Sequence, residues 1–248
     1  MSAYYSLAPF YDDLTQDVPY ERFADFYELI FRRYGVQPRM LLDLACGTGT
    51  LTVLLARRGY EMIGADASEE MLSVAMDKAA GEDLAVLPLF LCQSMEDLDL
   101  YGTVNAAICS LDGINYVPAE ALPEVFHKLH LFVEPGGVVI FDVNTPEKLR
   151  GLDGQVFLDE TEDVYCVWRA EFDDGRGALI YGMDVFARLD DDTWERGAEE
   201  HIEYAHSPAL LTQILTEQGF GEIAVFGELT DRPPKPGEQR IFVAARRV

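Results

Sequence analysis

The stretch from Met40 to Leu51 constrains the fold more than any other part of the chain. It reads Met-Leu-Leu-Asp-Leu-Ala-Cys-Gly-Thr-Gly-Thr-Leu, and its apolar run with a single acid predicts a buried parallel strand. The run stops at Gly47 and Gly49, and a helical pattern begins at once. A strand, a glycine turn and a helix form the first half of a βαβ unit, which holds a nucleotide at the helix N-terminus. Because glycines lack Cβ atoms, the backbone N–H groups of the turn can approach a ligand closely.

The residue three positions after the second glycine distinguishes two classes of nucleotide-binding site. A dinucleotide site needs a third small residue three positions after the second glycine, where this chain has Thr52. What stands here instead is acid-x-Ala-x-Gly-x-Gly, formed by Asp43, Ala45, Gly47 and Gly49. This motif resembles the first motif of the class I S-adenosylmethionine-dependent methyltransferases. The resemblance implies that S-adenosyl-L-methionine is the cofactor and S-adenosyl-L-homocysteine the product.

The next predicted strand, 61–66, ends in an acid. Asp66 lies 17 residues after Gly49, and an acid about 20 residues on, at the end of the second strand, is placed to accept both ribose hydroxyls. The alternative is a capping carboxylate for the helix that follows. Because Ser68 can cap that helix unaided, the sequence favours ribose binding.

The amino-acid composition indicates which classes of binding partner are favourable. The chain has 44 acids against 19 lysines and arginines, a formal charge of −25. Such a surface repels phosphate backbones and offers no basic stripe, so nucleic acid is an unfavourable partner. It favours a cationic or neutral substrate and suits a cationic sulfonium cofactor, although solubility or salt adaptation explains the charge equally well.

No long apolar run or signal peptide is present, which predicts a cytoplasmic protein without a membrane span. The four cysteines show no ligand spacing, so we expect reduced thiols and no metal.

The segment before Tyr20 is rich in aromatic residues. It contains Tyr4-Tyr5-Ser6-Leu7-Ala8-Pro9-Phe10-Tyr11-Asp12, similar to the Tyr-x-x-x-Ala-x-x-Tyr-Asp lead-in of many small-molecule members of the family. The resemblance implies a lid over the methionine end of the cofactor, containing Tyr5 and Tyr11. Plain packing on the edge of the core is the alternative.

Polar residues follow the third and fourth predicted strands, 84–91 and 103–109. Ser94 stands where the family usually has an acid beside the adenine, so backbone N–H groups, packing by Met95, or Asp97 are the expected substitutes. After the fourth strand come Asp112 and Asn115. Ligands sit beyond the carboxyl ends of strands in open parallel sheets, so these two side chains are candidates for orienting a nucleophile, with turn chemistry as the alternative.

The pattern changes from about residue 151. Period-two apolar runs joined by short Asp/Gly turns predict antiparallel hairpins, which we expect to cover the active-site mouth; an oligomer interface is the alternative. The resemblance implies an α/β, Rossmann-like doubly wound sheet of seven strands, the last one antiparallel, with this β insertion after the fifth. The expected division is 1–150 for the lid and cofactor part, 151–205 for the insertion and 206–248 for the closing helix and strands.

The implied reaction is methyl transfer to a small-molecule acceptor by in-line displacement, in a monomer or homodimer. It depends mainly on positioning, so no catalytic triad is expected. His201 and His206 are the best-placed bases, and the other catalytic candidates are Tyr11, Asp112 and Asn115. The predicted cofactor-binding residues are Tyr5, Tyr11, Asp43, Ala45, Cys46, Gly47, Thr48, Gly49, Asp66, Ala67, Met71, Gln93, Ser94, Met95, Cys109, Ser110 and Leu111. Two other functions stay open: a non-catalytic S-adenosylmethionine-binding protein acting in an assembly, and an NAD(P)-dependent oxidoreductase, which Thr52 disfavours.

Overall fold

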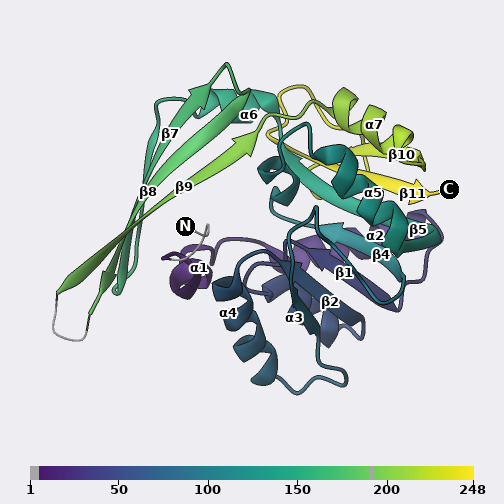
Figure 1. Ribbon diagram of the computed structural model, residues 1–248, viewed down its shortest axis with the longest axis horizontal. Coiled ribbons are helices and arrows are strands. Elements are labelled where there is room, and N and C mark those ends of the chain that lie inside the picture. Colours follow the sequence, from purple (N-terminus) through teal and green to yellow (C-terminus); the bar gives the residue numbers. More distant parts are fainter. Residues whose placement is uncertain (1–5, 190–192) are drawn as a thin grey trace.

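The computed structural model describes residues 6–189 and 193–248, and these form two sheets (Figure 1). The larger sheet has seven strands in the order β10-β11-β5-β4-β1-β2-β3. Strand β11 runs antiparallel to both of its neighbours, β5 and β10, and the other described strand pairs of this sheet are parallel. The predicted fold class is therefore confirmed. The strands of this sheet are β1 (Met40–Leu44), β2 (Glu61–Asp66), β3 (Leu89–Cys92), β4 (Val104–Cys109), β5 (Val133–Asn144), β10 (Phe220–Gly227) and β11 (Arg240–Arg247).

Helices cover both faces of this sheet because successive strand residues point to opposite sides. On β1, Leu41 packs into the core beneath α2 and α3, whereas Leu42 and Leu44 pack into the core beneath α5 and α7. The strands thus read as continuous apolar runs. The helical elements are η1 (Ala8–Phe10), α1 (Tyr11–Leu14), α2 (Tyr20–Arg33), α3 (Thr50–Arg57), α4 (Glu69–Ala80), η2 (Gly113–Tyr116), α5 (Leu122–Phe132), α6 (Pro146–Gly151) and α7 (Pro208–Glu217).

The smaller sheet is the predicted insertion after β5, and it leans away from the main sheet (Figure 1). Its order is β6-β7-β8-β9, with every pair antiparallel. One face carries the apolar residues that alternate along β7 and β8, and this face packs on the lead-in segment and on α6. The strands are β6 (Val156–Glu160), β7 (Val164–Asp173), β8 (Ala178–Arg188) and β9 (Trp194–Tyr204).

Several boundaries differ from the sequence prediction. The third strand begins at Leu89 instead of residue 84, directly after a proline that cannot donate to the ladder. The fifth begins at Val133, because the predicted turn at 134–137 is a wide irregularity inside β5, with Gly136 at φ +85°. Strand β6 and helix α6 were not predicted, although Thr145 at the N-cap and Pro146 at the first helical position mark the start of α6. In the described part of the chain, no helix combines the length and apolar character needed to cross a membrane.

Candidate active site

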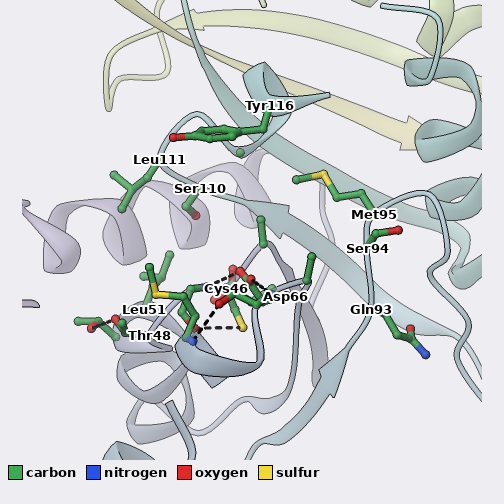
Figure 2. A pocket seen from close by; sticks show the side chains of 18 of the residues that line it. Cys46, Thr48, Leu51, Asp66, Gln93, Ser94, Met95, Ser110, Leu111 and Tyr116 are labelled. Atoms are coloured by element: carbon green, nitrogen blue, oxygen red, sulfur yellow. Dashed lines mark hydrogen bonds between the residues drawn. The ribbon is translucent and has the colours of Figure 1, made fainter. Parts of the chain in front are cut away.

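A cavity of about 270 Å³ lies at the carboxyl ends of β1, β2 and β4 (Figure 2). This is the edge of an open parallel sheet at which ligands bind. In Figure 2, Leu111 and Tyr116 face Cys46 and Asp66 across the cavity. The lining residues are Tyr11, Tyr20, Asp43, Ala45, Cys46, Gly47, Thr48, Thr50, Leu51, Asp66, Ala67, Ser68, Met71, Gln93, Ser94, Met95, Glu96, Ser110, Leu111, Gly113, Tyr116 and Val117.

The two glycines of the turn after β1 have different roles. Both have positive φ, +54° at Gly47 and +68° at Gly49, a conformation that glycine adopts without steric cost. A Cβ on Gly47 would meet no atom within 4 Å, whereas one on Gly49 would lie 2.8 Å from the Cβ of Ala75. Gly47 therefore leaves space on the cavity side, and Gly49, which does not line the cavity, lets the start of α3 approach α4.

The Asp66 carboxylate holds this turn in place. Its Oδ2 accepts the N–H of Gly47 at 2.8 Å, and its Oδ1 accepts the N–H of Ser68 at 2.9 Å. Burial raises the pKa of Asp66, and the hydrogen bonds from backbone N–H groups partly oppose that rise. The hydroxyl of Ser68 caps α4 by accepting the N–H of Met71, so Asp66 is not needed for that cap. Asp66 both faces the cavity and fixes the loop beside it.

Asp43 is buried at the floor of the cavity, 1% exposed. The hydroxyl of Thr52 donates to its Oδ2 at 2.5 Å. Burial raises the pKa of Asp43 to about 7, since the interior disfavours the charged form, and the nearby Asp66 charge adds to the effect. The threonine that departs from the dinucleotide pattern is thus the hydrogen-bond partner of the acid in the motif.

The charge of the walls selects between ligand classes. Among the described lining residues three are acidic, Asp43, Asp66 and Glu96, and none is a lysine, arginine or histidine. A pyrophosphate in this cavity would face carboxylates without a cation to pair with it. A cationic or zwitterionic ligand fits the same walls.

The loop after β3 forms one side of the cavity. Gln93 is held by two hydrogen bonds to the backbone of Asp99, and the hydroxyl of Ser94 donates to Asp97 at 2.9 Å. Met95 is partly buried and packs against the core. Ser94 and Met95 line the cavity but Asp97 does not, so packing by Met95 is available for a flat ring.

The turn after β4 forms the opposite wall. Ser110 shares a hydrogen bond of 2.7 Å with the hydroxyl of Tyr27. Asn115 does not line the cavity: its amide donates to the carbonyls of Asn144 and Tyr204, and its Oδ1 accepts the N–H of Asn144. Asp112 lies 2.6 Å from Arg240 in an ion pair. The structure thus places Asn115 and Asp112 in the frame behind the wall, and their proposed role toward a nucleophile stays a prediction.

The two candidate histidines also lie outside the cavity lining. His201, on β9, has its Nε2 3.0 Å from a carboxylate oxygen of Glu199, and its ring meets that of Tyr116 edge-on with 6.1 Å between centroids. The Nε2 of His206 lies 2.8 Å from the carbonyl of Val117, and burial lowers the pKa of this histidine. Each histidine therefore packs one layer behind a residue of the wall.

The lead-in segment lies between the insertion and the cofactor loop (Figure 1). Leu7 is buried against apolar residues of β7 and β8, and the carboxylate of Glu199 accepts its N–H at 3.1 Å. On the other side, Asp12 accepts the hydroxyl of Thr48 at 2.7 Å and pairs with Lys78 of α4 at 2.6 Å. Tyr11 lines the cavity. Tyr5 lies outside the described residues.

Fourteen of the predicted cofactor residues are brought together in the cavity lining, and Gly49 and Cys109 lie just behind it. The prediction lacked eight lining residues. Gly113 and Tyr116 follow the fourth strand, and ligands bind beyond the ends of such strands, so their position could have identified them. Thr50 and Leu51 directly follow the glycine turn and could have been identified in the same way. Tyr20 carried no such signal. The eight are Tyr20, Thr50, Leu51, Ser68, Glu96, Gly113, Tyr116 and Val117.

Comparison with known proteins agrees with this geometry. A family model described as a methyltransferase domain matches residues 41–137. A protein of Geobacillus sp. (strain WCH70), provisionally named a methyltransferase, is 28% identical over 98% of this chain and 99% of its own. The crystal structure of an S-adenosylmethionine-dependent methyltransferase from Clostridium acetobutylicum ATCC 824 is 27% identical, with a TM-score of 0.86 over 98% of both chains. A sugar N-methyltransferase from Streptoalloteichus sp. ATCC 53650 shares the fold, with 20% identity and a TM-score of 0.74 over 94% of this chain and 90% of its own.

Proposed function

Because this chain is a class I S-adenosylmethionine-dependent methyltransferase, we propose that it methylates a small molecule bound between the cavity and the insertion sheet. The observation that carries the proposal is the cavity wall formed by acids and aromatic residues, with Tyr11 from the lead-in and Tyr116 beside β9 at its edge.

The cavity fits the cofactor in charge and in shape. Its acidic walls suit a ligand with a cationic sulfur and an amino group. Gly47 offers open space and a turn backbone toward the ligand, and we assign the ribose hydroxyls to Asp66, which faces the cavity. Met95 and the backbone after β3 are assigned to the adenine.

When bound, S-adenosylmethionine supplies a methyl group on a cationic sulfur that leaves readily. The task left to the protein is to hold an acceptor in line and to exclude water. We assign the positioning surface to Tyr11, Leu111 and Tyr116. We assign proton acceptance to His201 in preference to His206, because the His201 ring contacts Tyr116 of the cavity lining, whereas the Nε2 of His206 is held by the carbonyl of Val117.

A small acceptor is supported by what surrounds the cavity. The lead-in packs under the insertion sheet and brings Tyr11 into the cavity lining, which supports an acceptor site between the insertion and the cavity. The net charge of −25 disfavours RNA. The sugar N-methyltransferase with the same fold acts on a small molecule, which supports the same class of acceptor here.

The test is transfer of a tritiated methyl group from S-adenosylmethionine to a panel of small amines, alcohols and phenols, with each product identified by mass spectrometry. The expected result is labelling of a subset of one chemical class. Cofactor binding without labelling of any member would favour the non-catalytic alternative, and labelling of protein or RNA alone would refute the small-molecule acceptor. A parallel assay of nicotinamide absorbance should show no change.

A further inference from the structure

The wall made by the turn after β4 has an unusual backbone. Leu111 and Asp112 are consecutive non-glycine residues with positive φ, +56° and +57°. Side chains rarely adopt this conformation, and it persists only where surrounding groups determine it. Two such residues in succession, inside a cavity wall, require an explanation from their neighbours.

That explanation is Asp142, at the end of β5, which was not among the predicted site residues. Its carboxylate accepts the N–H of Leu111 at 2.8 Å and the N–H of Asp112 at 3.0 Å. Its side chain is fully buried, 0% exposed. One carboxylate thus satisfies the N–H groups of both strained residues, and charged acceptors form the stronger kind of hydrogen bond.

Arg240, at the start of β11, completes the arrangement. Its guanidinium donates to Asp142 through one terminal nitrogen, and to the Asp112 carboxylate at 2.6 Å through the other. A buried carboxylate without a cation would be costly, and Arg240 supplies that cation while also tying the turn to the sheet. The side chains of Arg240 and Asp112 are each 15% exposed, which limits competition by water.

Displacement of the turn would reach the cofactor loop directly. A Cβ on Gly113 would lie 2.7 Å from the Cys109 sulfur, 3.2 Å from the Cβ of Ala45 and 3.4 Å from the Cε of Met95. The turn is therefore packed without slack between the glycine turn after β1 and the loop after β3. A shift of a few tenths of an ångström in the turn changes the width of the cavity.

We propose that Asp142 is a positioning residue for methyl transfer. It acts through the turn after β4, by fixing Leu111 and Asp112 in the conformation that sets the cavity wall, with Arg240 as its counter-ion. The proposal rests on the proposed use of this cavity by the cofactor.

Asp142→Asn tests the proposal, because the amide keeps the volume but offers one acceptor oxygen and brings a donor against Arg240. Binding of S-adenosylhomocysteine is measured by calorimetry, and hydrogen exchange is followed over residues 110–116. We expect binding to weaken at least about tenfold and exchange to accelerate in this turn. Asp173→Asn is the matched control: that carboxylate also accepts two backbone N–H groups beside an arginine, but it lies at the end of β7, in the insertion.

A second pair of variants separates positioning from general stability. Asp142→Asn combined with Leu111→Gly should recover part of the lost affinity, because glycine adopts a positive φ without support and the ion pair between Asp112 and Arg240 is kept. Arg240→Met replaces Asp142→Asn if the latter does not fold, and should weaken binding severalfold with the same local rise in exchange.

The outcomes are distinct. A folded Asp142→Asn protein that binds S-adenosylhomocysteine within twofold of the wild type overturns the positioning role while the proposed function stands. Wild-type protein that does not bind S-adenosylhomocysteine overturns both. Equal weakening by Asp173→Asn would also overturn the positioning role, because the effect would then be unspecific.

Discussion

Replacing Asp43 by asparagine should stabilise the protein without cofactor near neutral pH and destabilise it in acid. Burial raises the pKa of this carboxyl from 3.8 to about 7. The folded state therefore holds a proton that the unfolded state releases, so stability is highest below the unfolded pKa and falls as the pH rises toward the folded pKa. Asparagine, which does not ionise, has no such dependence.

The magnitude follows from these two values. A difference of about 3 pH units corresponds to about 4 kcal/mol, of which about 3 kcal/mol develops between pH 5 and pH 8. The carbonyl oxygen of asparagine can still accept the hydroxyl of Thr52, but its amide adds a buried donor that costs about 1–3 kcal/mol if unpaired. The variant should therefore gain stability of about 1–3 kcal/mol over the wild type at pH 8 and lose this advantage by pH 5.

Urea unfolding of both proteins from pH 5 to pH 8, without cofactor, measures the difference. Asp77→Asn on the exposed side of α4 is the matched control, since it makes the same chemical change in water. A stability difference for Asp43→Asn that stays constant across this range would refute the argument.

The same variant should bind S-adenosylmethionine roughly tenfold more weakly, because a buried charge facing a cation is lost. Asp43 would then lower the stability of the protein without cofactor and strengthen the binding of the cofactor.

Three further changes have defined outcomes. Asp66→Asn should weaken S-adenosylhomocysteine binding by roughly 1–3 kcal/mol, since one oxygen then serves two backbone N–H groups; calorimetry showing unchanged affinity would contradict this. Asp12→Asn, and more strongly removal of residues 1–19, should speed cofactor dissociation roughly tenfold by breaking the contact with Lys78, and stopped-flow fluorescence with Asp13→Asn as control would detect equal rates if the lead-in is not a lid. Gly113→Ala should cost about 1–3 kcal/mol in thermal unfolding, because its new Cβ would lie 2.7 Å from a sulfur; an unchanged melting temperature would show that the turn can shift.

Many of the cofactor-binding residues could be predicted from the sequence, because they lie close together along the chain. The positions of Gly47, Gly49 and Asp66 depend on one strand–turn–helix unit and the strand after it, so spacing along the sequence reproduces spacing in space. The alternating apolar residues of β7 and β8 identified the hairpins in the same way. The continuous apolar runs of the main sheet likewise predicted buried parallel strands.

The sequence by itself therefore determined the first parallel strands, the hairpins of the insertion and the residues of the glycine turn, since each follows from periodicity or from the conformational demands of a short segment. The number of strands in the main sheet and the sense of the last one came from the resemblance to the methyltransferase family. Tertiary structure alone decided which polar groups behind the wall meet. Asp142 and Arg240 are 98 residues apart, and they pair only because β11 returns antiparallel beside β5. His201 and Asn115 were read as polar residues near the mouth, yet folding directs them to Glu199 and to the backbone of β5 and β9. Burial set these contacts, because each polar group removed from water must take the partner that the packed strands bring within reach.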